Sequence, residues 1–203
     1  MTLSLEAVTG DSELAVGGTL NNTIGFDDGP FRPDHRGDVD LIGAVCCGDR
    51  LDGVLRTRVR RDGINSTNQI AAAVKASRFC EHVQLILLQG IAVAGFNVID
   101  IDTLSKGLSL PVIVVARHEP DLNAVRNALL HHVPGGRRKW RLIERAGPPM
   151  PGAGVWLQFK GITMDQAVDT VRQLAVHGAI PEPLRLAHLI AGGISDLETH
   201  QRP

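Results

Sequence analysis

Apolar and polar positions alternate along the first third of the chain in a pattern that is typical of β-strands. Runs rich in aliphatic and β-branched residues cover residues 22–28, 39–47 and 53–60. The last two runs flank a short turn that contains Gly48 and Asp49, and they are predicted to form a hairpin. Connections this short make the three strands antiparallel, because parallel neighbours need a crossover of about a dozen residues or more.

After Gly63 the hydrophobic pattern changes to an alternation of helices and buried strands. Amphipathic segments predict helices, and continuous apolar runs bounded by glycine predict strands that are buried on both faces. The predicted elements are, in order, a helix at 67–79 capped by Thr67, a strand at 82–90, a helix at 96–107, a strand at 110–116, a helix at 119–133, short strands at 139–145 and 155–160, and helices at 163–177 and 182–194.

This order of elements predicts an α/β fold with a mixed five-stranded sheet, strand order 3-2-1-4-5, and helices on both faces. Three antiparallel strands followed by alternating helices and parallel strands are typical of the ribonuclease H-like architecture. We expect residues 21–195 to form a single domain of this kind. An irregular lead-in at 1–20 would precede it, and a flexible tail at 196–203 would follow it.

The composition restricts where the protein works and what it binds. Lys plus Arg total 21 against 22 for Asp plus Glu, so nucleic-acid binding would need a local basic patch. The three cysteines include no Cys-x-x-Cys pair, which indicates a reducing compartment. Neither a signal peptide nor an apolar run of about 18 residues is present, so we expect a cytoplasmic protein with no membrane partner.

Candidate chemistry begins at "GFDDGPF", where the first predicted strand ends on two adjacent aspartates. In the ribonuclease H-like architecture, acids on the first strand, near the start of the first helix and at the end of the fourth strand converge to hold Mg²⁺. Asp27 or Asp28 fills the first position, and alternation along the strand brings one of them to the site. Asp-Asp-Gly-Pro is equally typical of a strand that ends in a turn, so both interpretations stay open.

The other two expected acid positions hold amides. Asn68 lies at the start of the first predicted helix, with Asp62 just upstream, and Gln89 ends the fourth predicted strand. Amide oxygens can bind a hard cation, but they bring no charge to the site. Asp100 would reach the site if the loop at 90–96 folds back. A turn role for Asp62 and a helix-end role for Asp100 are the alternatives.

Two segments are candidates for contact with a phosphate backbone. Arg58 and Arg60 alternate with Arg56 along the predicted edge strand, so all three point to one face. The alternative is that these charges prevent edge-to-edge aggregation. Residues 135–145 form the densest basic segment.

Within that segment, Arg138 and Lys139 supply charge, and Trp140 is available to stack on a base. A solvated loop is the alternative for this segment. Arg185, at the start of the last predicted helix, is a further nucleic-acid candidate. Helix packing is the alternative role for Arg185.

The sequence also resembles a known family. The matching strings are "GFDDGPF", "GAVCCGDRLDGVL", "VRRDGINST", "LILLQGIAVAGFNVIDI", "LPVIVVARHEPD" and "GAIPEPLRLAHLIA". They resemble the endonuclease dU family, a largely archaeal family long described as domain of unknown function 99 and related to endonuclease V. The resemblance implies an endonuclease V-like fold, nicking of DNA at deoxyuridine, and Asp27 or Asp28 as first metal ligand. Asn65, Asn68 and Gln89 stand where the family pattern carries acids.

Two functions follow as hypotheses. The first is an endonuclease that uses Mg²⁺ or Mn²⁺ to nick DNA at deoxyuridine or other deaminated bases, with Asp27, Asp28 and Asp62 as catalytic residues. The expected metal ligands are Asp27, Asp28, Asn68, Gln89 and Asp100. The alternative is a catalytically impaired relative that binds nucleic acid or a protein, with weak or no metal binding because amides replace acids.

Overall fold

The computed structural model describes residues 20–200, and the side chains of residues 20–194. The predicted lead-in at 1–20 therefore lies outside the described residues, except for Leu20. The first three strands are β1 (Asn22–Asp28), β2 (Asp38–Cys47) and β3 (Arg50–Arg60). They are antiparallel as predicted, with Asn22 opposite Cys47 and Asp28 opposite Leu41.

The middle of the chain alternates helices with parallel strands. Its elements are α1 (Ser66–Ala76), β4 (Leu85–Gln89), β5 (Ala92–Val93), β6 (Asn97–Val98), α2 (Ile101–Leu108) and β7 (Val112–Ala116). β4 pairs with β1 and β7 pairs with β4, both in parallel, which confirms the predicted order of the first five strands. The predicted helix at 96–107 begins late, because residues 97–98 pair with 92–93 in a short hairpin.

The C-terminal third enlarges the sheet beyond the predicted five strands. Its elements are α3 (Leu122–His132), α4 (Gly136–Ala146), β8 (Met150–Gly152), β9 (Val155–Lys160), α5 (Met164–Leu174) and α6 (Glu182–His200). β9 pairs antiparallel with β7, and β8 pairs with β9. The seven-stranded order is β3-β2-β1-β4-β7-β9-β8.

Three local predictions are corrected. The strand predicted at 139–145 is wrong: this segment is α4, because Lys139, Ile143 and Ala146 recur at helical spacing and are buried. Thr67 does not cap α1; its hydroxyl accepts a hydrogen bond from the Asp100 N–H at 2.9 Å. The predicted tail at 196–203 overlaps the end of α6, and residues 201–203 lie outside the described part.

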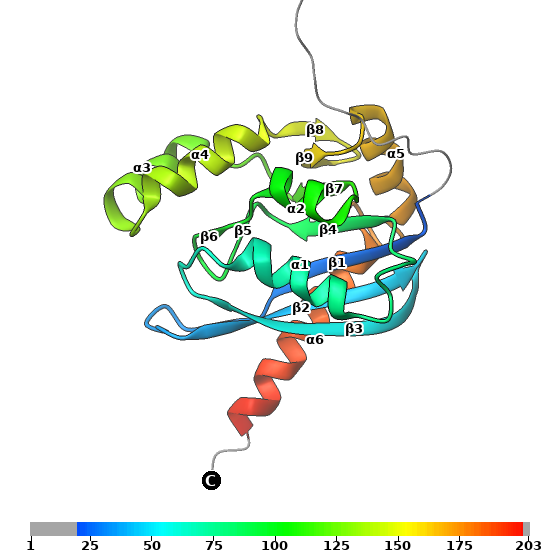
Figure 1. The fold of residues 1–203 in the computed structure, drawn as a ribbon, viewed down its shortest axis with the longest axis horizontal. Helices are drawn as coiled ribbons and strands as arrows, with labels where there is room; N and C mark the ends of the chain where they lie inside the picture. Colours follow the sequence, from blue (N-terminus) through cyan, green and yellow to red (C-terminus); the bar gives the residue numbers. More distant parts are fainter. Residues whose placement is uncertain (1–19, 201–203) are drawn as a thin grey trace, which may run out of the picture.

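Helices cover both faces of the sheet, as predicted (Figure 1). α1 and α2 pack on one face, over a core that includes Ile24, Phe26 and Leu88. α5 and α6 pack on the other face, over Leu85 and Leu87. Burial of these apolar side chains is the main force that holds the layers together.

The carboxyl ends of β1, β4 and β7 share one edge of the sheet, because these three strands are parallel. The β5–β6 hairpin and the paired helices α3 and α4 lie along this edge (Figure 1). No helix in the described part of the chain is long and apolar enough to cross a membrane. In open α/β sheets, ligands bind outside the carboxyl ends of the strands, so this edge is where we place the candidate site.

Candidate active site at the carboxyl edge of the sheet

The two aspartates at the end of β1 point to opposite faces of the sheet. Asp27 shares its face with Gly25, where a Cβ atom would lie 2.4 Å from the carbonyl carbon of Pro183. Gly25 therefore allows the start of α6 to approach β1 closely. Asp28 shares the opposite face with Phe26, on the side of α1 and α2.

Asp27 is buried and pairs with an exposed histidine from α6. Asp27 is only 6% exposed, and its Oδ2 lies 2.8 Å from Nδ1 of His188. The second oxygen, Oδ1, accepts a hydrogen bond from the Asp28 N–H at 3.0 Å. Burial raises the pKa of Asp27, and the bond and charge of His188 oppose this rise.

His188 was not identified from the sequence, although a signal for it was present. Leu184, Ala187 and Ala191 form the buried stripe of α6, and His188 adjoins this stripe at helical spacing. The side chain of His188 is 71% exposed, so its ring contacts both the buried carboxylate and solvent. Such a histidine can accept a proton from a solvent molecule at the site.

Asp28 is fixed by the β5–β6 hairpin. Its Oδ2 accepts a hydrogen bond from the Ala94 N–H at 2.9 Å. Burial, followed by the neighbouring charge of Asp27, raises the pKa of Asp28 to about 6, against the lowering effect of the Ala94 bond. Asp27, Asp28 and His188 line one cavity of about 520 Å³, together with residues 29–31 and Gly192.

Asp62 does not line this cavity; it holds the hairpin instead. Asp62 has a φ of +50°, its N–H donates to the Ala94 carbonyl at 2.9 Å, and its Oδ1 accepts from the Phe96 N–H at 2.8 Å. The structure therefore gives Asp62 a contact that positions the hairpin, and its catalytic role stays a prediction.

Of the remaining predicted metal ligands, Gln89 lies on the strand next to Asp27, whereas Asn68 and Asp100 lie at the starts of helices. Gln89 ends β4 on the same face as Asp27, one step beyond the Phe26–Leu88 register pair. Asn68 is exposed on the first turn of α1. Asp100 caps α2 by accepting from the Thr103 N–H at 3.1 Å. It also pairs with Arg145, so the structure gives it the helix-end role.

Asn65 is part of the turn that precedes α1. Its side-chain oxygen accepts hydrogen bonds from the Arg60 N–H at 3.0 Å and from Nδ2 of Asn97 at 2.8 Å. These hydrogen bonds stabilise the turn that leads from β3 into α1, and the bond to Asn97 links this turn to β6. Asn65 therefore has a structural role in which an amide serves well.

The cavity offers two carboxylates, which is fewer protein ligands than a closed metal cage needs. Among the described residues, no group of three or more His, Cys, Asp or Glu side chains is placed to hold a metal. Asp27 and Asp28 line the cavity, whereas Gln89 ends the neighbouring strand β4 and is not among the lining residues. Mg²⁺ commonly uses one or two carboxylates and completes its shell with water and substrate phosphate. Burial raises the pKa of both aspartates, because it disfavours their charged forms.

Most residues predicted to contact nucleic acid have partners within the protein. Lys139 is 1% exposed and cannot reach a ligand from this position, so that prediction is wrong for the folded chain. Trp140 is half-buried, and its Nε1 donates to Glu144 Oε1 at 2.6 Å. Arg185 donates hydrogen bonds from Nε and Nη2 to the two carboxylate oxygens of Glu182.

On β3, the arginines form ion pairs with β2. Arg58 Nε lies 3.2 Å from Asp40, which also pairs with Arg56, and Arg60 lies 3.6 Å from Asp38. These pairs fit the edge-protection alternative for this strand. On α4, Arg138 is exposed.

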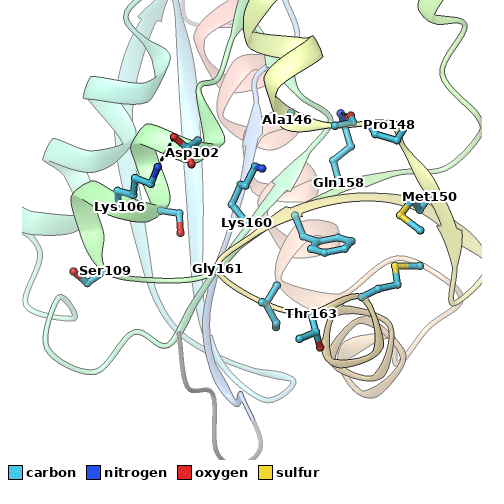
Figure 2. A pocket seen from close by; sticks show the side chains of 15 residues that line it. Asp102, Lys106, Ser109, Ala146, Pro148, Met150, Gln158, Lys160, Gly161 and Thr163 are labelled. Atoms are coloured by element: carbon cyan, nitrogen blue, oxygen red, sulfur yellow. Dashed lines mark hydrogen bonds and ion pairs between the residues drawn. The ribbon is translucent and has the colours of Figure 1, made fainter. Parts of the chain in front are cut away.

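Two further cavities lie on the face of the sheet covered by α2 and α4. An apolar cavity of about 300 Å³ adjoins the carboxyl edge, beside Gly90, and is lined by Ile91, Leu122 and Trp156. A cavity of about 580 Å³ lies between α2, β9 and the start of α5, with Lys160 pointing into it (Figure 2). This second cavity is at the amino end of β7, so it is separate from the candidate site.

The endonuclease dU family model matches residues 21–195. The chain belongs to the endonuclease dU family. It is 51% identical to a UPF0215 protein of Deinococcus radiodurans, over 87% of this chain and 90% of that relative. It is 43% identical to a UPF0215 protein of Methanothermobacter thermautotrophicus, over 85% of this chain and 86% of that relative.

Solved structures place this endonuclease dU family member among the endonuclease V folds. A crystal structure from Archaeoglobus fulgidus matches with a TM-score of 0.80 and 30% identity, over 85% of this chain and 97% of that one. Endonuclease V of Bacillus subtilis matches with a TM-score of 0.62 and 14% identity, over 94% and 88%. Endonuclease V of Ciona intestinalis, in complex with an inosine-containing DNA, matches with a TM-score of 0.58 and 13% identity, over 89% and 87%. The fold is thus endonuclease V-like and ribonuclease H-like, as predicted.

Proposed function

We propose that this protein is an endonuclease that cleaves a phosphodiester bond at the carboxyl edge of the sheet, next to a deaminated base such as uracil in DNA. Family membership and the fold support a nuclease-like function. The observation that carries the proposal is the pair of the buried Asp27 and the exposed His188, which lines a cavity with Asp28 at the edge where this architecture binds ligands.

In the proposed reaction, the exposed nitrogen of His188 accepts a proton from water as the water oxygen attacks phosphorus. The bond between phosphorus and the leaving sugar oxygen breaks, and that oxygen takes a proton from solvent. Asp27 orients the imidazole through Nδ1 and stabilises the imidazolium that forms. This arrangement requires Asp27 to be ionised.

Mg²⁺ or Mn²⁺ is the proposed cofactor, held by Asp27 and Asp28 with Gln89 as a neutral ligand. The ion would stabilise the negative charge that develops on the phosphate oxygens. Because amides occupy the other expected acid positions, we propose that the ion binds weakly to the free protein and more tightly in the presence of nucleic acid.

The proposed partner is DNA, and two surfaces near the site suit it. The exposed arginines of α4 supply positive charge, and they are Arg137, Arg138 and Arg141. The apolar cavity beside Gly90 is a suitable receptor for a base that leaves the helical stack, with Trp156 in its wall. The inosine-containing DNA in the Ciona endonuclease V complex supports a nucleic-acid ligand for this fold.

The alternative function is a catalytically impaired member that binds nucleic acid or a protein. The observation that favours it is the exposed Asn68 and the amide Gln89 in place of acids, with two carboxylates left at the cavity. The two functions differ in whether the protein turns over its ligand.

The test uses three labelled duplexes that differ at one position, with deoxyuridine, deoxyinosine or thymidine. Each is incubated with the protein in Mg²⁺, in Mn²⁺ and in chelator. We expect a nick near deoxyuridine that requires a divalent ion. Binding of the duplex without any nick, in both metals, would support the impaired alternative and contradict the endonuclease.

A further inference from the structure

Lys139 is a buried cation on a helix whose neighbouring basic residues are exposed. Its side chain is 1% exposed, whereas Arg138 and Arg141 on the same helix lie at the surface. Its Nζ donates to the main-chain carbonyl of Asp62, in the turn after β3. Burial lowers the pKa of Lys139, and the charge of Asp62 opposes this effect. A buried ammonium is unfavourable unless it is hydrogen-bonded, so this contact needs a specific explanation.

The Asp62 turn is bonded directly to the β5–β6 hairpin. Asp62 donates its N–H to the Ala94 carbonyl at 2.9 Å and accepts from the Phe96 N–H at 2.8 Å. Ala94 in turn donates its own N–H to Asp28 Oδ2 at 2.9 Å. Three hydrogen bonds, joined through the backbone of Asp62 and of Ala94, thus connect Lys139 on α4 to Asp28 in the candidate site.

The hairpin depends on these bonds for its position. Its two strands have only two residues each, and a hairpin of this length is not stable by itself. Ala94 and Gly95, at its tip, have φ values of +48° and +82°, conformations that the surrounding bonds must hold. On the other side, Nδ2 of Asn97 donates to the Arg60 carbonyl at 2.9 Å. A change at the Asp62 turn would therefore move the tip that fixes Asp28.

We propose that Lys139 is a positioning residue for Asp28: its ammonium holds the Asp62 turn, the turn holds the hairpin tip, and the tip fixes the carboxylate. The link to catalysis rests on the proposed function, whereas the link from Lys139 to the hairpin does not. Lys139 lies in the same helix as the exposed arginines proposed to bind DNA. The surface that receives the nucleic acid and the carboxylate that acts on it are thus connected through the protein interior.

The first test replaces the ammonium and keeps the volume. Lys139→Met retains a long unbranched side chain and removes the donor to Asp62. Amide hydrogen exchange is measured at Ala94 and Phe96, with Lys75→Met, an exposed lysine of α1, as the matched control. We expect Lys139→Met to accelerate exchange at both amides by about tenfold or more, with no comparable change in β7 or in the control. Uniform acceleration over the whole domain, or unchanged exchange at both amides, would overturn the proposal.

If Lys139→Met does not fold, native-state amide hydrogen exchange on the wild-type protein tests the same link between α4 and the hairpin. The proposal predicts that the amides of Ala94, Phe96 and the buried Ile143 of α4 open together as denaturant rises, below global unfolding. Opening of the hairpin amides independently of α4 would contradict it. Both exchange experiments are valid even if the protein does not nick DNA, so they separate this inference from the proposed function.

If the protein nicks DNA, kinetics provide a further readout. We expect Lys139→Met to lower kcat by about tenfold or more while KM changes by less than about threefold, because Asp28 is displaced and the surface arginines are untouched. A rise in KM with unchanged kcat would show that Lys139 affects binding instead, and would overturn the positioning role.

Discussion

Gly95 gives a quantitative test of the hairpin that fixes Asp28. Its φ of +82° is a conformation that an alanine adopts at a cost of about 1–2 kcal/mol. A Cβ atom at this position would also lie 2.5 Å from Oδ1 of Asp62, the atom that accepts the Phe96 N–H. Gly95→Ala therefore combines backbone strain with a collision at the hydrogen bond that holds the hairpin.

The expected loss of stability follows from these two effects. Displacement of a hydrogen bond to a charged carboxylate destabilises by about 1.5–3 kcal/mol. The lower entropy of alanine in the unfolded chain offsets about 0.5–1 kcal/mol. We predict a net decrease in the free energy of unfolding of about 2–4 kcal/mol, equivalent to a Tm lower by about 4–16 °C for a domain of this size.

The assay is urea unfolding followed by circular dichroism, with Gly107→Ala as the matched control. Gly107 lies within α2, has no positive φ, and a Cβ atom there would meet nothing within 4 Å. We expect the control to be neutral or to gain up to about 1 kcal/mol, with an unchanged m-value for both variants. If Gly95→Ala is as stable as the wild type, the proposed constraint on the hairpin is refuted.

Two further predictions concern α6 and α4. The Arg185 guanidinium beside Glu182 holds the pKa of that carboxyl below its ordinary value of 4.5. The ionised Glu182 carboxylate therefore stabilises the fold fully above its ordinary pKa, and this stabilisation is lost as the pH falls through the lowered pKa. Glu182→Gln should for this reason reduce the fall in Tm between about pH 5 and pH 3. A Tm–pH curve identical to that of the wild type would contradict the pair. On α4, Arg138→Ala should weaken duplex binding and reduce the slope of log Kd against log salt by about one, as measured by fluorescence anisotropy; an unchanged slope would show that Arg138 does not contact phosphate.

The sequence predicted the central part of the fold because its hydrophobic periods are strong there. The bounds predicted for β1 are confirmed, because its apolar residues alternate along the strand and Gly29-Pro30 marks where the strand ends. α4 was misread because its many basic residues obscure the spacing of Lys139, Ile143 and Ala146. The strand predicted at 155–160 is confirmed as β9, whereas β8 was missed because it has only three residues and lies at the sheet edge, where sequence patterns are weakest.

The candidate site was predictable in part. The position of Asp27 followed from the strand order, but its partner His188 is 161 residues away, and their contact depends on how closely α6 packs on β1. The role of Asp62 depends on a left-handed turn that a sequence does not reveal. Lys139 was expected at the surface because lysine is rarely buried, and its burial depends on a main-chain carbonyl from another element.

The most direct measurement is single-turnover cleavage of a duplex that contains one deoxyuridine, comparing the wild type with Asp27→Asn and His188→Gln. Matched controls are Asp34→Asn, on the exposed loop after β1, and His131→Gln, on the exposed face of α3. Because a positioned general base contributes about 10²–10⁴-fold, we predict that each site variant lowers the cleavage rate by at least about 100-fold while duplex affinity changes little. The controls should cleave at the wild-type rate. Wild-type cleavage by Asp27→Asn and His188→Gln would contradict the assignment of this pair as the centre of the reaction.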